Sequence, residues 1–161
     1  MIIRHACAGD LGAINDIYNH YVSSSTCTWQ YAPMPADERR AWLEAHDAEH
    51  PITVAVLDGE IVGFGSLKMY NRREGYRFTV ENTVYVRHDR HRRGVGRALV
   101  ADLIERARAA GHRSIIASIS ADQDASVALH RAAGFVEVGR MKELGVKFGT
   151  WLDCVYLQKL L

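Results

Sequence analysis

Where apolar side chains recur every three or four residues, the chain is predicted to form helices with one buried face. Four stretches show this spacing, and Asp, a common helix-capping residue, opens three of them. The first predicted helix runs from Asp10 to residue 21, the third covers residues 98–110, and the fourth begins at Asp124. The second begins at Asp37, with Trp42 and Leu43 on its buried face and Glu38, Arg39 and Arg40 mostly outside.

Other stretches are rich in β-branched and aromatic residues and predict strands. Asp58-Gly59 is a strong signal for a tight hairpin turn between two of them. Gly63 and Gly65 in the second of these strands indicate close backbone approach or a bulge. Strands are predicted over residues 2–6, 52–57, 61–67, 78–86, 114–119, 135–141 and 151–157. The order of elements predicts a mixed sheet with helices packed on it, and the length suits one domain over residues 1–161.

Composition narrows the class of protein. With 48% hydrophobic and 24% charged residues, the chain has the make-up of a globular protein. A formal net charge of +1 argues against a nucleic-acid partner. No apolar run approaches the ~20 residues that span a bilayer, and no secretory signal opens the chain. The three cysteines are widely spaced, so we expect neither disulfides nor a zinc site, and we expect a cytoplasmic location.

The segment from Arg87 to Arg97 carries the clearest chemical signal. It holds five arginines and one acid within eleven residues, between a predicted strand and a predicted helix. Backbone N–H groups at a helix start attract anions, and Gly94 and Gly96 leave room for a phosphate to approach them. There is no Gly-Lys-Ser/Thr for a Walker A loop, and Leu99 stands where a dinucleotide fingerprint needs a third glycine. The alternative is a solvated, arginine-rich helix start.

This loop resembles the acetyl-CoA loop of the GCN5-related N-acetyltransferase superfamily, Gln/Arg-x-x-Gly-x-Gly/Ala, with His91 at the Gln/Arg position. The resemblance extends to the phosphinothricin and methionine sulfone/sulfoximine acetyltransferase branch. The blocks that carry it are residues 17–21 with 28–29, 79–86, 125–130 with 134–135, and 147–153. It implies an α/β (α+β) fold with a mixed, mostly antiparallel central sheet of about seven strands flanked by helices.

The resemblance also implies acetyl-CoA as co-substrate, with no metal. The spacing His88-x-x-His91 lacks a third ligand, which likewise disfavours a metal site. Asp124 stands where the family often has Asn. The residues expected to bind the cofactor are Val84, Tyr85, Val86, His91, Arg92, Arg93, Gly94, Val95, Gly96, Arg97, Asp124 and Ser126, with the main chain of Val84–Val86 as donors for the oxyanion.

Two residues match the family's catalytic positions. Glu81 is the expected general base, because an amine must lose a proton before it attacks a thioester. The alternative reading of Glu81 is an ordinary outward-facing strand acid. His130 stands where many members place a tyrosine near the sulfur, and it is the candidate proton donor to the leaving thiolate. The alternative for His130 is a packing or surface residue.

A polar loop before the Glu81 strand carries the candidate substrate site. Arg suits a substrate carboxylate because its planar fork can bind both oxygens. The residues expected to bind the substrate are Arg72, Arg73, Tyr76, Trp29 and Lys147, of which Arg73 and Tyr76 best match the branch. The alternatives are a solvated hairpin tip for the arginines and core or subunit packing for Trp29.

The leading hypothesis is transfer of the acetyl group of acetyl-CoA to the primary amine of a small amino acid-like molecule. Methionine sulfone, methionine sulfoximine and phosphinothricin are the expected kinds of substrate. Two other hypotheses stay open: acetylation of a protein N-terminus or lysine, and a non-catalytic acyl-CoA sensor. The branch is usually dimeric, so a homodimer is expected.

Overall fold

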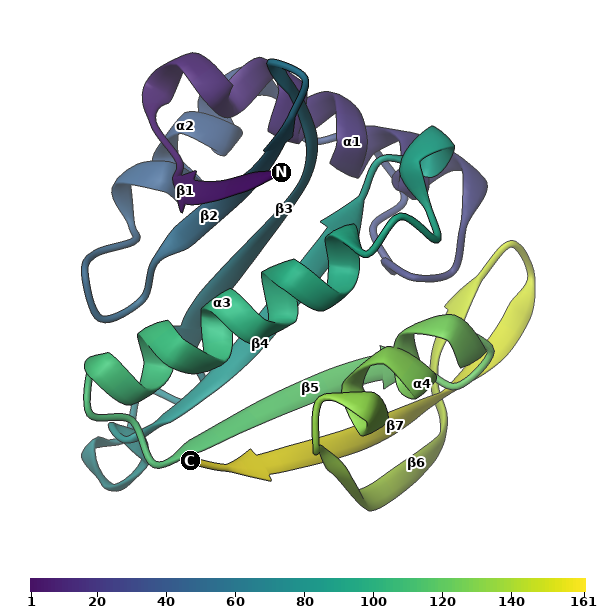
Figure 1. Cartoon of the computed structure of the whole chain (residues 1–161). Coiled ribbons are helices and arrows are strands. Elements are labelled where there is room, and N and C mark those ends of the chain that lie inside the picture. The colour runs from purple at the N-terminus through teal and green to yellow at the C-terminus, as the bar shows by residue number, and fades with distance from the viewer.

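The computed structural model describes all 161 residues of the chain. It has seven strands, four α-helices and three short 3₁₀ turns (Figure 1). The strands are β1 Ile2–His5, β2 Ile52–Leu57, β3 Glu60–Met69, β4 Thr79–Val86, β5 Ser114–Ser120, β6 Val136–Lys147 and β7 Thr150–Leu160. The α-helices are α1 Leu11–Ser24, α2 Ala36–Glu44, α3 Val95–Ala109 and α4 Asp124–Ala132.

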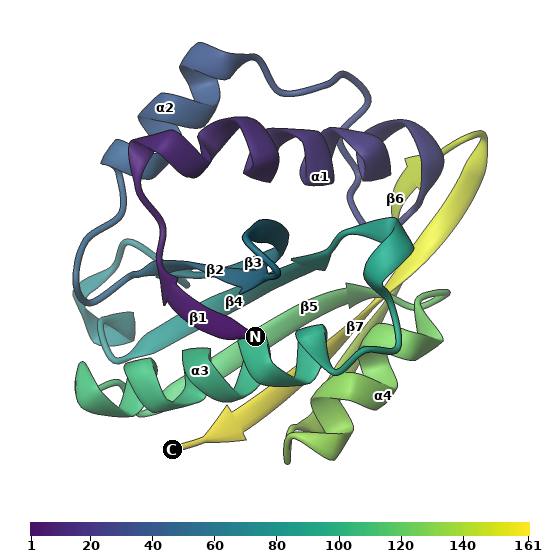
Figure 2. The same ribbon diagram turned by 45° about the horizontal axis from the view of Figure 1, so that its top comes forward.

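All seven strands belong to one sheet in the order β1-β2-β3-β4-β5-β7-β6. Every neighbouring pair is antiparallel except β4 and β5, which are parallel. The predicted mixed, mostly antiparallel sheet flanked by helices is therefore confirmed. Figure 2 shows α1 and α2 over one face and α3 and α4 over the other.

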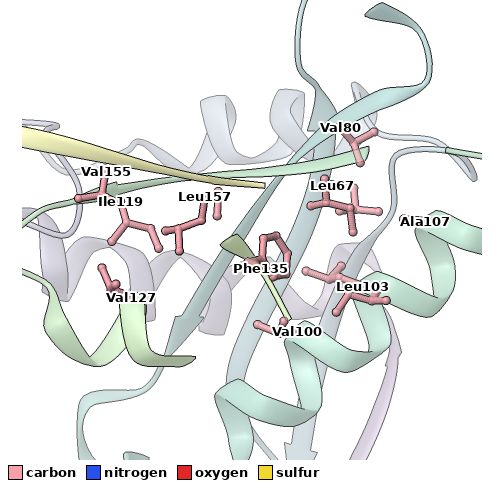
Figure 3. Packing of buried hydrophobic residues seen from close by; sticks show 13 residues of the cluster. Leu67, Val80, Val100, Leu103, Ala107, Ile119, Val127, Phe135, Val155 and Leu157 are labelled. Atoms are coloured by element: carbon pink, nitrogen blue, oxygen red, sulfur yellow. The ribbon is translucent and has the colours of Figure 1, made fainter. Parts of the chain in front are cut away.

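The largest apolar cluster lies between the sheet and helices α3 and α4. Figure 3 shows Phe135 beside Leu103 and Val100 of α3, with Leu157 and Ile119 on its other side. The two β3 glycines bring α3 close to the sheet. A Cβ on Gly63 would lie 3.1 Å from Leu99 Cδ1, and a Cβ on Gly65 would lie 2.9 Å from Leu103 Cδ1. The predicted close backbone approach at these glycines is confirmed.

The opposite face is covered by α1 and α2, where one expectation was wrong. Arg39 was expected to point outward, but it is only 2% exposed. Its guanidinium lies 4.7 Å from the Tyr18 ring centre and 4.6 Å from that of Trp42, and its Nε donates to Asn15. Aromatic faces stabilise a buried cation by their ring quadrupoles, which explains how an arginine is accommodated here.

Several element boundaries also differ from the prediction. Helix α3 begins three residues earlier than expected, at Val95, because Gly94 adopts the left-handed conformation that starts it. Pro35, not Asp37, is the N-cap of α2, and Gln123, not Asp124, is the N-cap of α4. Strands β6 and β7 each extend well beyond their expected ends, since their pairing continues to a turn at Phe148 and Gly149.

The parallel pair β4 and β5 is short. It joins only Thr79 to Ser114, Val80 to Ile115 and Glu81 to Ile116. Beyond Glu81 the two strands part, while β4 continues to Val86 beside β3 and β5 continues to Ser120 beside β7. Figure 1 shows the two arrows starting together and diverging toward their tips. This opening, which we call the β4–β5 splay, positions the site described below.

The link between β1 and α1 depends on a buried carboxylate. Both Asp10 oxygens accept hydrogen bonds from the Arg4 guanidinium, at 2.7 and 2.8 Å, and Oδ2 also accepts one from the Cys7 N–H at 2.8 Å. These bonds lower the pKa of Asp10 from 3.8 to about 2. Asp10 was expected to cap α1 with its side chain. Asp10 does stand at the N-cap position, but its carboxylate stabilises the turn before the helix and makes no capping hydrogen bond.

Because the pKa of Asp10 is lower in the folded state, its contribution to stability is present above pH ~4 and is lost as the pH falls toward 2. We expect Asp10→Asn to lower the free energy of unfolding by about 1–2 kcal/mol at pH 7 and by much less at pH 2. Urea denaturation at both pH values measures this. The exposed Asp16→Asn is the control, and an equal loss at both pH values would contradict the assignment.

Candidate active site

The loop between β4 and α3 presents an unbroken series of free backbone donors. None of the N–H groups from His91 to Arg97 has a hydrogen-bond partner, and the first N–H of α3 that does is that of Ala98, bound to Gly94 at 3.0 Å. Gly94 has φ of 79°, which favours glycine, and open space surrounds the position of its missing Cβ. Free N–H groups at a helix start form an anion site, so the loop has the geometry to hold phosphate oxygens.

Gly96 was expected only to leave room for a phosphate, but it also allows two helices to pack closely. A Cβ there would lie 3.1 Å from Leu129 Cδ2 on α4. Its lack of a side chain therefore lets α4 approach the first turn of α3. The N–H of Gly96 stays free, so the residue serves helix packing and keeps its donor for an anion.

The loop's arginines fall into two groups. Arg87 and Arg90 are paired with Glu60 at 3.0 and 3.1 Å, and Arg87 also binds Asp89 at 2.7 Å. Arg92, Arg93 and Arg97 are exposed and have no carboxylate within 4.0 Å; these three are the arginines predicted to face the ligand. The positive charge available to an anion is thus concentrated beside the free N–H groups.

Helix α1 holds this loop from the other side. The Tyr21 hydroxyl lies 2.7 Å from His91 Nε2 and 2.5 Å from the Val86 carbonyl, to which it donates. Burial raises the pKa of Tyr21 to about 12, so the hydroxyl keeps its proton. The residue before Tyr21 makes a second contact, in which the His20 and His88 rings stack at 4.0 Å. His91, which stands at the family's Gln/Arg position, is therefore anchored to the protein through its ring.

The edge of β4 that faces the splay is defined by its pairing with β3. Arg87 donates to Val62, and Tyr70 donates to Thr79, so the odd-numbered β4 residues bond to β3. The backbone N–H groups of Val84 and Val86, which lie beyond the last β4–β5 pair, consequently face the opening between β4 and β5. The backbone of Tyr85 bonds to β3 instead, so of the three residues expected to line the splay with main-chain groups, Val84 and Val86 do so.

His130 lies at the α4 side of the splay, with both ring nitrogens engaged. It is 4% exposed, with Nδ1 2.8 Å from the Ser126 carbonyl and Nε2 2.9 Å from Asn82 Nδ2. Burial lowers the pKa of His130, which favours the neutral ring. Nδ1–H then donates to Ser126 and Nε2 accepts from Asn82. In this arrangement the single ring proton of the neutral His130 is directed at the Ser126 carbonyl.

Asn82 was not identified from the sequence, yet it joins β4 to α4. Its side chain is 7% exposed, and its Oδ1 is buried without a hydrogen-bond partner. Such an atom costs about 1–3 kcal/mol in the folded state. Strand alternation places Asn82 on the α4 face and Glu81 on the opposite face, and this was the signal available in the sequence.

At the start of α4, Asp124 is exposed and Ser126 is half-buried. The residues just before them are tied to the segment that follows α1. Asp122 accepts hydrogen bonds from Thr26 at 2.5 Å and from Ser120 at 2.7 Å, while Gln123 donates to Thr26 at 2.8 Å. This network holds the link between β5 and α4, on the β5 side of the splay, against the segment that follows α1.

Glu81 is the last β4 residue paired with β5, so its side chain stands at the apex of the splay. Its carboxylate is one-fifth exposed and lies 3.0 Å from the ammonium of Lys68, its cross-strand partner on β3. The Tyr70 and Tyr76 rings lie 5.7 Å apart at the end of β3. Lys68 was not identified from the sequence, although the register between β3 and β4 places it opposite Glu81.

The predicted substrate loop forms an open pocket of about 410 Å³ beside the end of β3. Arg72 and Arg73 line it as expected for a substrate site, together with Met69, Asn71, Glu74 and Arg77. Three guanidinium groups against one carboxylate give this pocket a net positive charge. It therefore has the composition of a site for an acidic group.

The structure gives Lys147 and Trp29 contacts within the protein. The Lys147 ammonium is buried and donates to the carbonyls of Ser25 and Thr28, both at 2.6 Å, and to Tyr21 at 3.5 Å. Its three N–H donors are thus used at the end of α1, and none remains for a substrate. The Trp29 ring packs on the backbone of Gly145, where a Cβ would lie 2.4 Å from it. Both residues therefore hold the segment after α1 against β6.

No group of three His, Cys, Asp or Glu side chains stands together in a way that would hold a metal ion. None of the helices combines the length and apolar character that crossing a membrane requires.

The free donors of the loop lead to a direct prediction. Alanine at Gly94 is disfavoured by about 1–2 kcal/mol in the left-handed conformation, so the loop is expected to rearrange and misalign its N–H groups. We expect Gly94→Ala to weaken coenzyme A binding roughly 5–30-fold in calorimetric titrations. Gly111, at the other end of α3, has φ of 80° and open space around it, so Gly111→Ala is the matched control. Equal affinity for Gly94→Ala and wild type would contradict the assignment.

Comparison with known proteins agrees with this geometry. Residues 14–135 match the Acetyltransferase (GNAT) family. The L-methionine sulfoximine/L-methionine sulfone acetyltransferase of Pseudomonas paraeruginosa is 42% identical over 97% of this chain and 92% of its own. The phosphinothricin N-acetyltransferase of Alcaligenes faecalis is 40% identical over 93% of this chain and 77% of its own.

Two solved structures superpose closely. A Brucella melitensis protein described as a ribosomal-protein-alanine N-acetyltransferase has a TM-score of 0.97 and 40% identity, and the match covers 100% of both chains. The yncA protein of Salmonella typhimurium, solved with acetyl-CoA, has a TM-score of 0.96 and 37% identity over 99% of this chain and 93% of its own. The chain belongs to the GNAT family of acetyltransferases.

Proposed function

We propose that this enzyme transfers the acetyl group of acetyl-CoA to the primary amine of a small amino acid-like substrate. The observation that carries the proposal is the arrangement along β4. The free N–H groups of residues 91–97 follow its end, and Glu81 stands at the apex of the splay about 17 Å earlier along the strand. A donor held by its diphosphate at the loop and extended along the splay brings its thioester toward this carboxylate.

In this proposal the main chain and the side chains of the loop make different contacts with acetyl-CoA. The N–H groups of Gly94, Val95 and Gly96 face the diphosphate, and Arg92, Arg93 and Arg97 supply the compensating charge. His91 supports the loop through Tyr21. The start of α4, with Asp124 and Ser126, lies on the other side of the splay.

Glu81 acts as the general base in this proposal. It takes a proton from the substrate ammonium, directly or through a water molecule, and the free amine attacks the thioester carbonyl carbon. The N–H groups of Val84 and Val86 face the splay and are fixed before reaction, so they are the donors placed to stabilise the oxyanion. Collapse of the intermediate breaks the C–S bond and releases the thiolate of coenzyme A, and the attacking nitrogen loses its second proton to solvent to give the neutral amide.

The released thiolate takes its proton from solvent in this scheme, because the neutral His130 has both nitrogens occupied. His130 is assigned instead to positioning: through Asn82 and Ser126 it joins β4 to α4 at the apex of the splay. In this proposal Lys147 and Trp29 hold the segment after α1 against β6 and do not contact the substrate. Arg72, Arg73 and Tyr76 are the proposed contacts for an acidic or strongly polar group of the substrate.

The substrate class follows from the charge and shape of the pocket and from the names of the relatives. A positively charged pocket beyond the end of β3, together with the Glu81 carboxylate on the neighbouring strand, suits a small molecule with both an amine and an acid. Methionine sulfone, methionine sulfoximine and phosphinothricin meet this description. The name of the Brucella melitensis structure supports a second candidate, acetylation of a protein N-terminus.

We also propose a homodimer in the cytoplasm. Strand β6 is one of the two edge strands of the sheet, and its hairpin with β7 exposes large apolar side chains, a feature of protein interfaces. These are Val136, Val138, Met141, Leu144, Phe148 and Trp151. Three free cysteines suit a reducing compartment. Light scattering of the purified protein tests the oligomeric state.

A thiol-release assay with a panel of amines separates the candidate functions. Turnover with free amino acid analogues supports the proposal, and turnover with peptides alone supports protein acetylation. Coenzyme A binding without turnover of any amine would indicate a sensor and contradict the proposal.

We expect Glu81→Gln to lower kcat by roughly 10²–10⁴-fold, because the amide cannot accept the proton of the ammonium. The variant keeps the size of the side chain, so the dissociation constant of acetyl-CoA should not change. Steady-state kinetics from pH 6 to about 9 with calorimetric binding measures both. Glu44→Gln, at the exposed end of α2, is the control. Unchanged turnover of Glu81→Gln at every pH would remove Glu81 from the mechanism.

A further inference from the structure

A lysine stands beside the proposed base. Lys68 Nζ lies 3.0 Å from Glu81 Oε2, and this pair joins directly opposed residues of β3 and β4 on the face away from α3 and α4. The Lys68 side chain is 56% exposed, against 20% for Glu81. The cation is therefore at the open side of the pair, where a substrate would enter.

Lys68 has unused capacity for an anion. An ammonium has three donors, and Glu81 is its one carboxylate partner within 4.0 Å. The guanidinium groups of Arg72, Arg73 and Arg77 are grouped in the separate pocket beyond the end of β3. The two positive features are thus distinct: one touches the base, and the other is set apart from it.

The chemistry of an α-amino acid matches this spacing. Its amine and carboxylate are attached to the same carbon, so when the amine is at Glu81 the carboxylate must lie within a few ångströms of the same side chain. A group that neutralises this carboxylate has to be adjacent to the base itself. Lys68 meets this condition, whereas the arginine pocket suits an acidic or strongly polar group at the far end of the substrate.

We propose that Lys68 binds the α-carboxylate of the substrate and so selects free α-amino acids carrying a second polar group at the distal end. This rests on the proposed acetyltransferase function and deepens it. Glu81 and the substrate carboxylate share the Lys68 ammonium, one on each side. A peptide N-terminus, whose α-carboxylate has become an amide, loses this interaction and is discriminated against.

The test compares methionine sulfone with its α-carboxamide as acceptors, at saturating acetyl-CoA. A hydrogen bond to a charged group is worth about 1.5–3 kcal/mol, or roughly 10–100-fold in kcat/KM. We expect Lys68→Met to lower kcat/KM for the acid by this factor and to change that for the amide less than about threefold. Lys68→Arg keeps the charge and should retain most of the preference. Because the acid-to-amide ratio is compared between variants, the different basicity of the two amines cancels.

Control variants keep the outcomes distinct. Lys159→Met removes a lysine beside Gly134, at the end of α4 on the other face of the sheet, and should leave the ratio unchanged. Arg73→Ala should lower kcat/KM for acid and amide together, since both keep the sulfone. Equal losses with both acceptors in Lys68→Met would show that Lys68 only supports Glu81, and would overturn the inference. Absence of turnover in the wild type with either acceptor would instead count against the proposed function.

Discussion

The separation of β4 from β5 after Glu81 is the feature on which the rest of the site depends. Two adjacent parallel strands normally satisfy each other's backbone groups along their whole length. Here three pairs form and the ladder ends, which leaves the N–H groups of Val84 and Val86 directed at an opening. The fold accepts this loss because both strands keep their other neighbours, β3 and β7.

Because the strands separate, three different groups lie one after another along β4 and at its end. A carboxylate stands at the apex, free main-chain donors line the strand beyond it, and the anion-binding start of α3 follows its end. The surroundings keep this order rigid. Gly63 and Gly65 seat α3 on the sheet, Gly96 admits α4, and Tyr21 fixes the loop from α1. A donor molecule can therefore be bound along an edge that exists before it arrives.

Much of this architecture could be predicted from local patterns in the sequence. Periodicity gave the helices and strands, because each element buries one face, and the glycines and arginines of residues 87–97 indicated an anion site through the known properties of a helix start. The side chains misjudged were those whose partners lie far away along the chain. Lys147 satisfies carbonyls more than 110 residues earlier, and His130 bonds to Asn82, 48 residues away. Arg39 is buried by two aromatic rings, one of them on another helix. No local pattern shows that a charged residue has such partners.

A crystal structure with coenzyme A and methionine sulfone bound would show whether the β4–β5 splay holds the acetyl donor. We expect diphosphate oxygens within hydrogen-bond distance of the N–H groups of Gly94, Val95 and Gly96, with the sulfur at the apex of the splay and the substrate amine facing Glu81. A diphosphate bound elsewhere, or a sulfur atom remote from Glu81 while the β4–β5 splay stays empty, would contradict it.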